Sequence, residues 1–404
     1  MIQHISHHLY RGRKNTELNE IYFSMGFYTF ALSLIMVFIP IYFYSLGYAL
    51  REILSYYIFV YSFLAIGVVL AGWLVTRFGA KHIIALSLPI TAISFVLLLT
   101  LGTYHWPIWI IAFLYGISQA FYWVAYHDDF SKAKHRKAAG KEVGRMHVFT
   151  AVAGAFGPII GGFVGQAMGL PFMMGITAFL LIIAVVPLFK TSEITKRRPI
   201  QKENFDIKKN WKDIVSYGGL GVETTASGII WPLFVFILVG NFVKVGSITT
   251  IALLVMIAVT VYVGKMTDKY EKRKVLRAGG IINFVGCSLR TLATSLNLAY
   301  IISILSSTAF IFINIPFVSE YYLRADEEPR IEYIMSMEVG INLMRVLGFS
   351  MLFISTFFLN TKMVLVLGFA LGAAGVLLSM NIGKSSRKEK AKIKVQREVA
   401  RAGA

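Results

Sequence analysis

The sequence has a single cysteine, Cys287, among its 404 residues. An internal disulfide needs two cysteines, and a structural zinc site needs several cysteine or histidine ligands at set spacings, so neither kind of scaffold is expected. Charge is also scarce, because charged residues make up 15% of the chain while hydrophobic residues make up 56%. A soluble domain carries more charge than this. The composition therefore predicts an integral membrane protein.

Motifs for enzymatic chemistry are missing as well. The chain shows no Ser-His-Asp set, no metal-ligand spacing, no glycine-rich phosphate loop and no ATP-binding motif. These absences argue against one competing class, a polytopic membrane enzyme such as an acyl or glycosyl transferase, and predict that no cofactor or metal is used. The other competing class is a substrate-sensing receptor, which normally has a long signalling loop or tail, and none is found.

What the chain does contain is a series of apolar runs of about 20 residues, each long enough to cross the roughly 30 Å hydrocarbon core as a helix. Twelve spans are predicted, at residues 18–45, 52–76, 82–102, 106–127, 142–165, 170–189, 213–239, 246–266, 275–295, 297–322, 333–358 and 361–382. The predicted parts are an N-terminus (1–17), a six-helix bundle (18–189), a polar basic linker (190–212), a second six-helix bundle (213–382) and a basic tail (383–404). The predicted fold is an all-α membrane protein with twelve transmembrane helices in two six-helix repeats.

The basic residues are distributed very unevenly. The net charge is +19, and the N-terminus, every second loop and the tail hold 35 of the 40 Lys and Arg residues. The loops on the other face carry only Arg51, Lys244 and Lys362. By the positive-inside rule, both termini are cytoplasmic and the protein is predicted to lie in the cell membrane. The lipid bilayer, rather than a nucleic acid, is the expected partner of this charge.

The two halves repeat each other at an offset of 192 residues. The loop G-W-L-V-T-R-F-G-A-K that begins at Gly72 returns as G-K-M-T-D-K-Y-E-K-R-K at Gly264, and Pro40 returns as Pro232. A Gly-x-x-x-Asp-Arg/Lys signal on a short loop in both halves resembles the loop signature of the major facilitator superfamily, with Thr76 where the family usually has Asp. The resemblance implies two bundles that rock about a central site.

The resemblance also implies a cytoplasmic gate of residues that exchange partners between the halves. Its predicted members are Gly72, Arg77, Asp129, Arg136, Gly264, Asp268 and Lys269. The alternative is a cluster of surface salt bridges, which are usually worth under about 1 kcal/mol. His127 lies beside two aspartates, and we interpret it as an interfacial histidine rather than a metal ligand or proton relay.

The fifth span reads G-R-M-H-V-F-T-A-V-A-G-A-F-G-P-I-I-G-G. Its residues Gly157, Pro158, Gly161 and Gly162 resemble the fifth-span pattern of the antiporter subgroup of the superfamily. Physically, such a helix is thin and easily bent, so the opposite half can pack closely against it. A general small-residue contact between helices is the alternative.

In the family, the first, fourth, seventh and tenth helices line the central cavity. On these spans the polar residues predicted to line it are Thr29, Ser33, Tyr115, Gln119, Tyr122, Glu223, Ser227, Trp231 and Asn314. Charges inside spans each cost about 2.5 to 3.5 kcal/mol on insertion scales, so they need partners. We predict that Glu223, Glu338 and Arg345 serve ion coupling, with Glu223 paired to Arg345 and Glu338 as the rival partner. A purely structural buried pair is the alternative.

Together these features predict a monomeric secondary transporter that moves a small molecule by alternating access, with a proton or sodium ion as coupling ion. The fifth-span pattern and the aromatic residues favour proton-coupled efflux of an amphipathic compound. Uptake or facilitated transport of a small metabolite remains an alternative.

Overall fold

The computed structural model describes residues 19–133, 139–189 and 199–382, without the side chains of 139–141, 189, 268, 269 and 272. The predicted termini 1–17 and 383–404 lie outside this part, which is helical and contains no strand. Eleven helical segments in it are long and apolar enough to cross a membrane. They are Asn19–Ser45, Leu50–Phe78, Ala80–Leu99, Ile108–Ala133, Glu142–Met168, Leu170–Leu188, Ile207–Val239, Phe242–Thr267, Leu296–Glu327, Arg330–Ser355 and Thr361–Ser379. The predicted all-α membrane fold is confirmed.

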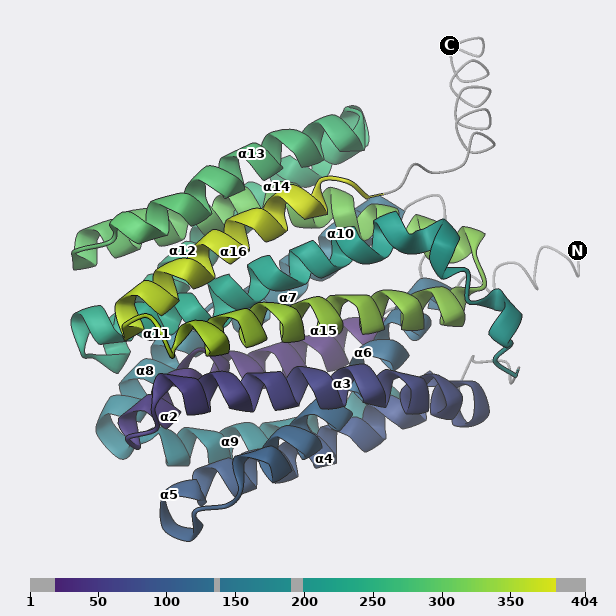
Figure 1. The fold of residues 1–404 in the computed structure, drawn as a ribbon. Helices are drawn as coiled ribbons and strands as arrows, with labels where there is room; N and C mark the ends of the chain where they lie inside the picture. The colour runs from purple at the N-terminus through teal and green to yellow at the C-terminus, as the bar shows by residue number, and fades with distance from the viewer. Residues whose placement is uncertain (1–18, 134–138, 190–198, 383–404) are drawn as a thin grey trace, which may run out of the picture.

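The ninth predicted span, 275–295, is occupied by α13 (Lys272–Leu289) and the short η6 (Arg290–Leu292). This helix is not among the eleven candidates. Its first turns carry Arg273, Lys274 and Arg277, which shorten its apolar part. It still packs along α14 (Leu296–Glu327) and α16 (Thr361–Ser379) within the second half, as Figure 1 shows.

Most of the first half of the described chain lies low in Figure 1, in purple, blue and blue-teal, and most of the second half lies above it, in teal, green and yellow. After the first helix, whose outer part is η1 (Met36–Phe38) and α2 (Ile39–Ser45), the first half contains α3 (Leu50–Phe78), α4 (Ala80–Leu99), α5 (Leu101–Tyr104), α6 (Ile108–Ala133), α7 (Ala139–Gly154), α8 (Gly157–Met168), α9 (Leu170–Ile183) and η3 (Val186–Phe189). The second half contains η4 (Lys202–Asn204), α10 (Ile207–Thr225), η5 (Ala226–Ile230), α11 (Trp231–Val239), α12 (Phe242–Lys269), α13, η6, α14 (Leu296–Glu327), α15 (Arg330–Ser355) and α16 (Thr361–Ser379).

Helix α10 begins at Ile207, although the sequence predicted its span from residue 213. The carboxylate of Asp206 accepts a hydrogen bond from the backbone N–H of Lys209 at 2.9 Å, so Asp206 caps the helix. A capped polar turn can extend an apolar helix beyond its hydrophobic run, and hydropathy alone does not detect such a turn.

Both halves break their first helix at the same place in the repeat. Pro40 lies in the first turn of α2 after the 3-10 turn η1, and Pro232 lies in the first turn of α11 after the π-helix η5. Proline has no backbone N–H and its ring crowds the preceding turn, so the regular α-helical hydrogen bonding stops before it. Pro158 begins α8 in the same way.

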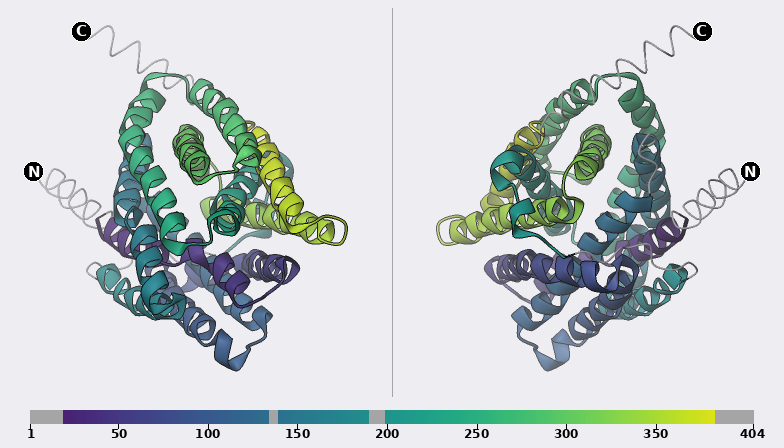
Figure 2. Two further views of the ribbon diagram at one scale, coloured as in Figure 1. Left: turned by 90° about the vertical axis from the view of Figure 1, so that its left-hand side faces the viewer. Right: turned by 90° about the vertical axis from the view of Figure 1, so that its right-hand side faces the viewer.

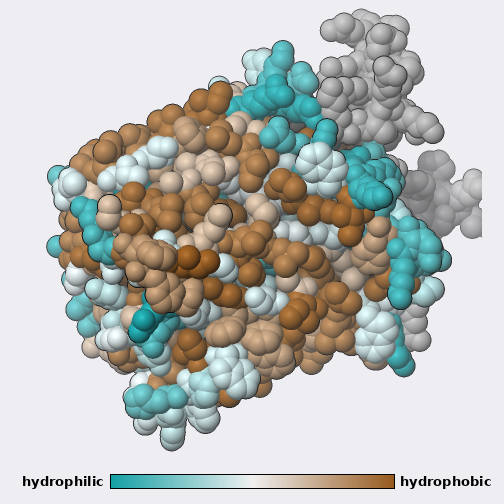
Figure 3. All heavy atoms as spheres, in the orientation of Figure 1, coloured by the Kyte–Doolittle hydropathy of each residue, from teal (hydrophilic) through white to brown (hydrophobic). Residues whose placement is uncertain are grey.

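The outer surface of the helices is apolar. Ile66, Phe179, Tyr262 and Ile281 are each more than 60% exposed. Figure 3 shows that hydrophobic side chains cover the middle of the visible face and that hydrophilic ones gather toward its ends. Contiguous apolar surface of this extent is typical of contact with lipid. The protein is a multi-pass membrane protein.

The helices run between two faces of the bundle. One face, which we call the basic face, carries the turns at Gly79, Glu271 and Pro329; the opposite face carries the turns at Gly47 and Gly169. Successive spans connect alternately at these two faces. The sequence prediction that the basic face is cytoplasmic remains a prediction.

The two halves meet along two seams, visible in the end-on views of Figure 2. In one seam α3 lies against α15, where a Cβ added to Gly72 would overlap the sulfur of Met335. In the other, α8 lies against α12, and the backbone N–H of Ile159 donates to Thr250 Oγ1 at 3.1 Å. Of the predicted fifth-span glycines, Gly162 makes close contact with the other half, at Phe242, whereas Gly157 and Gly161 contact the first helix of their own half.

Candidate functional site

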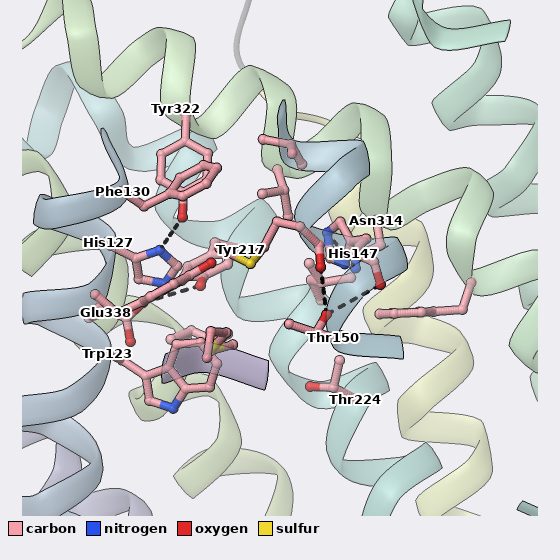
Figure 4. A pocket seen from close by; sticks show the side chains of 18 of the residues that line it. Trp123, His127, Phe130, His147, Thr150, Tyr217, Thr224, Asn314, Tyr322 and Glu338 are labelled. Carbon is pink, nitrogen blue, oxygen red and sulfur yellow. Dashed lines mark hydrogen bonds and ion pairs between the residues drawn. The ribbon is translucent and has the colours of Figure 1, made fainter. Parts of the chain in front are cut away.

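A cavity of about 290 Å³ lies between the two halves (Figure 4). Its lining residues His127 and Tyr322 belong to the ends of α6 and α14 that lie toward the basic face. Its apolar walls include Met25, Trp123, Phe130, Met146, Leu220 and Phe310. Its polar lining consists of Tyr126, His127, His147, Thr150, Tyr217, Thr224, Asn314, Tyr322, Glu338 and Arg345. Pockets that bind small molecules have this composition, with mostly apolar walls and a few polar groups.

One side of the cavity is a hydrogen-bonded group that joins the halves. His127 of α6 approaches Glu338 of α15, with 3.4 Å between Nε2 and Oε1, and its Nδ1 lies 2.7 Å from the hydroxyl of Tyr322 on α14. The hydroxyl of Tyr217 on α10 donates to the same Glu338 oxygen at 3.1 Å. The side chains of His127 and Glu338 are 9% and 5% exposed. A buried histidine and a buried carboxylate thus face each other across the boundary between the halves, as Figure 4 shows.

The other side of the cavity holds Arg345. Its guanidinium donates to Asn342 Oδ1 at 3.1 Å, to Thr224 Oγ1 at 3.3 Å and to the backbone oxygen of Gly221 at 3.5 Å. It also lies over the ring of Tyr61, 5.0 Å from its centroid, on α3 of the first half. Arg345 is therefore held by neutral groups from both halves.

The predicted pair between Glu223 and Arg345 is not formed in the described part of the chain. Arg345 contacts Gly221 and Thr224, whereas Glu223 Oε1 accepts a hydrogen bond from Ser227 Oγ at 2.6 Å. Successive residues of an α-helix are rotated by about 100°, so Thr224 faces the cavity while Glu223 points into the second bundle. Glu338 does not take the role of rival partner either, because His127 and Tyr217 contact it.

Glu223 belongs to a second polar cluster, which does not line the cavity. Arg290 Nη2 donates to Ser227 Oγ at 2.8 Å, and the Arg290 guanidinium lies over the ring of Trp231, 5.6 Å from its centroid. Trp231 Nε1 donates to Ser303 Oγ at 2.9 Å. The predicted cavity residues Glu223, Ser227 and Trp231 are thus brought together with Arg290 around the π-helix η5.

The predicted cavity residues of the first half hold its helices together and do not line this cavity. Tyr28 donates to Gln119 Oε1 at 2.7 Å, and the rings of Tyr28 and Tyr122 stack with centroids 3.8 Å apart. The remaining three contact neighbouring helices: Thr29 approaches Gly154, Ser33 approaches Gly157, and the Tyr115 hydroxyl donates to Met36 Sδ. Asn314 alone among the nine predicted residues lines the cavity, where its Nδ2 is 3.4 Å from His147 Nε2.

The predicted gate residues are spread along the basic face. Arg77 is exposed and lies over the rings of Trp73 and Phe78, and Asp129 is fully buried near the end of α6. Gly264 faces open space. Arg136 and the side chains of Asp268 and Lys269 lie outside the described residues.

Other contacts cross between the halves near the predicted gate. Ser131 of α6 donates to Asp326 of α14 at 3.5 Å, and Arg330 also donates to Asp326, at 3.2 Å. The rings of Phe130 and Tyr322 meet with centroids 4.9 Å apart. None of Asp326, Tyr322 and Phe130 was singled out from the sequence.

The sequence also provides a signal for His127, which we interpreted from the sequence as an interfacial histidine rather than a metal ligand or proton relay. His127 directly follows Tyr126 on the fourth span, and an ionisable residue in an apolar run is a candidate functional group. His147 has no comparable pattern around it. Within the described residues, no three His, Cys, Asp or Glu side chains come close enough together to hold a metal ion.

A family model matches most of the chain. The family model described as Major Facilitator Superfamily matches residues 21–348. The uncharacterised protein YqgE of Bacillus subtilis (strain 168) is 22% identical over 343 residues, which are 80% of this chain and 79% of YqgE.

Solved structures with the same fold include two transporters. The fucose:proton symporter FucP of E. coli has a TM-score of 0.65 and 12% identity, over 91% of this chain and 98% of FucP. The human organic anion transporter MFSD10 (TETRAN) has a TM-score of 0.67 and 11% identity, over 91% of this chain and 99% of MFSD10. At these identities the likeness concerns the fold alone.

The family model covers most of the chain. The chain therefore belongs to the major facilitator superfamily and is a secondary transporter of a small molecule, not an enzyme.

Proposed function

We propose that this transporter is a proton-coupled exporter of a small amphipathic compound. The observation that carries the proposal is the contact between His127 of the first half and Glu338 of the second, inside the cavity. Both side chains bind and release protons, and they lie on opposite sides of the boundary at which the halves must separate during alternating access.

Proton binding can link the contact between His127 and Glu338 to the separation of the two halves. With His127 protonated and Glu338 ionised, the two attract each other by about 4 kcal/mol at an effective dielectric constant of roughly 20, before the cost of desolvation. A second proton, on the carboxylate, removes this attraction. Proton binding therefore weakens the contact between the halves on the basic side of the cavity, and proton release restores it. The fold is compatible with such coupling, since FucP is a fucose:proton symporter.

Efflux and an amphipathic substrate are supported by other features. The cavity has a mostly apolar wall, which suits a compound that dissolves in lipid. The fifth span, whose Gly162 packs against α12 while Gly157 and Gly161 pack against the first helix, resembles that of the antiporter subgroup. Uptake or facilitated transport of a small metabolite is the competing function. In proton-coupled uptake the compound and the proton cross the membrane in the same direction, whereas in the proposed export they cross in opposite directions.

The test uses the full chain in proteoliposomes that contain a pH-sensitive dye. A panel of amphipathic compounds is added with and without an imposed pH gradient. We expect at least one compound to cause protein-dependent proton movement, in the direction opposite to its own. Glu338→Gln should abolish this movement and gradient-driven accumulation while it preserves counterflow exchange.

The matched control is Glu203→Gln, an exposed carboxylate in η4. It should behave like the unmodified protein. Exchange that is indifferent to the pH gradient, or a Glu338→Gln protein that still accumulates substrate, would show that the proposed coupling is wrong. Compound and proton that move in the same direction would favour uptake.

A further inference from the structure

Arg345 brings into the cavity a positive charge that no protein carboxylate neutralises. Among the described residues, no Asp or Glu oxygen lies within ion-pair distance of its guanidinium, and its hydrogen-bond acceptors are an amide, a hydroxyl and a backbone carbonyl. An arginine inside a membrane span usually pairs with an anion, because an uncompensated charge there is costly. The cavity therefore has one cation that requires a counter-ion from elsewhere.

The guanidinium is also arranged to bind one. It has five N–H groups, and three of them are used by Asn342, Thr224 and Gly221. Two N–H groups are left for a ligand. The guanidinium carbon lies over the ring of Tyr61, 5.0 Å from its centroid, and this cation–π contact helps to hold the guanidinium in place. Such a planar, oriented fork matches a carboxylate better than a lysine ammonium does.

The other charged groups of the cavity do not provide this counter-ion. Glu338 lies seven residues before Arg345 on α15, roughly 10 Å along the helix, and is contacted by His127 and Tyr217. His147 is next to the amide of Asn314. The cavity thus has a satisfied carboxylate near the basic face and an unneutralised arginine deeper in the bundle, with apolar walls between them.

We propose that the substrate is an organic anion, whose carboxylate is bound by Arg345 and whose aromatic or aliphatic body lies against the apolar wall. Trp123, Leu220, Phe310 and Ile341 form this wall. The volume of about 290 Å³ is at the lower end of the range of ligand pockets and suits a body of one or two rings. The inference rests on the proposed function, because it names the class of compound that the same cavity transports.

The test measures binding to the detergent-purified full chain, without any gradient. The probes are 2-naphthoate, 2-naphthamide and 2-naphthylmethylamine, which share one ring system and carry a negative, neutral or positive head group. The same head groups on a phenyl body cover smaller ligands. We expect the carboxylates to bind at least about 10-fold more tightly than the amides, and the amines to bind most weakly.

Variants of Arg345 identify the group responsible. Arg345→Gln should weaken carboxylate binding by about 10- to 100-fold and leave amide binding unchanged, the range for lost hydrogen bonds to a charged group. Arg345→Lys keeps the charge without the fork and should give an intermediate loss. The control Arg51→Gln removes an exposed arginine near the opposite face and should change nothing. Melting temperatures of all variants establish that each one is folded.

Each possible result of these binding measurements either supports or refutes the proposed anion site. Amides or amines that bind as tightly as the carboxylates, no binding by any probe, or an Arg345→Gln protein with undiminished carboxylate preference would overturn the inference. The proposed function can fail separately from this inference. If carboxylates bind through Arg345 but transport is not coupled to protons, the anion site stands and the proton coupling is wrong. If a pH gradient drives transport of neutral or cationic compounds alone, the anion site is wrong and the proton coupling stands.

Discussion

The substitution Gly246→Ala tests how the halves are closed at the opposite face. Gly246 lies on α12, and an added Cβ would overlap the backbone carbonyl oxygen of Pro158 at the start of α8. A backbone atom cannot rotate away as a flexible side chain can, so the two helices must separate. On the same side, a Cβ on Gly162 would come within 2.7 Å of the backbone oxygen of Phe242. The seam therefore offers little room for adjustment.

The magnitude follows from the cost of overpacking. Inserting one methyl group into a well-packed contact costs about 1 to 3 kcal/mol. The described arrangement, with α8 closed on α12, bears this cost, whereas an arrangement with the seam open does not. The equilibrium between the two should therefore shift toward the open seam by about 5- to 150-fold.

The assay is the accessibility of one introduced cysteine. Val235 on α11 is 1% exposed in this structure, and Val235→Cys in a Cys287→Ser background provides a buried reporter. We expect Gly246→Ala to speed its reaction with a membrane-impermeant maleimide by a factor within that range. The control is Gly144→Ala on α7, where an added Cβ meets nothing within 4 Å. An unchanged reaction rate, or the same acceleration in the control, would refute the reasoning.

Three further predictions concern stability, coupling and topology. Asp213→Asn removes the carboxylate that Arg324 contacts at 3.0 Å, so it should destabilise the protein by about 3 to 5 kcal/mol. The control Lys209→Ala breaks a partly exposed ion pair and should lower the melting temperature much less. Equal shifts in melting temperature for the two variants would contradict this prediction. Glu223→Gln should abolish accumulation driven by a pH gradient and preserve counterflow exchange; undiminished accumulation would restrict coupling to Glu338. Lys244→Cys should react with an impermeant thiol reagent from outside the cell, and reaction from inside only would reverse the predicted topology.

Much of the fold follows from local features of the sequence. An apolar run of about 20 residues forms a helix in a membrane whatever its neighbours are, because its backbone groups have no other partners there. The breaks at Pro40 and Pro232 are local in the same sense, since proline itself lacks the N–H group. The predicted span 275–295 is the one that does not reappear among the candidate membrane-spanning helices of the described residues, because the basic first turns of α13 shorten its apolar run.

Close helix contacts were also predictable, although their partners were not. The glycines of the fifth span indicated a thin helix. In the structure the first helix packs closely against Gly157 and Gly161, and α12 packs closely against Gly162. Composition shows that a helix can be approached closely. Only the assembled bundle decides which helix approaches it.

The lining of the cavity was decided by the tertiary structure. Glu223 and Thr224 are neighbours in sequence, yet Thr224 lines the cavity and Glu223 joins Arg290 in a separate cluster. His127 was interpreted as interfacial, and its contact with Glu338 joins two helices from different halves. The sequence by itself determined the spans, their breaks and the repeat, because these depend on residues close together in the chain. The rotation of each helix about its axis, which selects the side chains that meet in the cavity, depends on packing among all the helices at once.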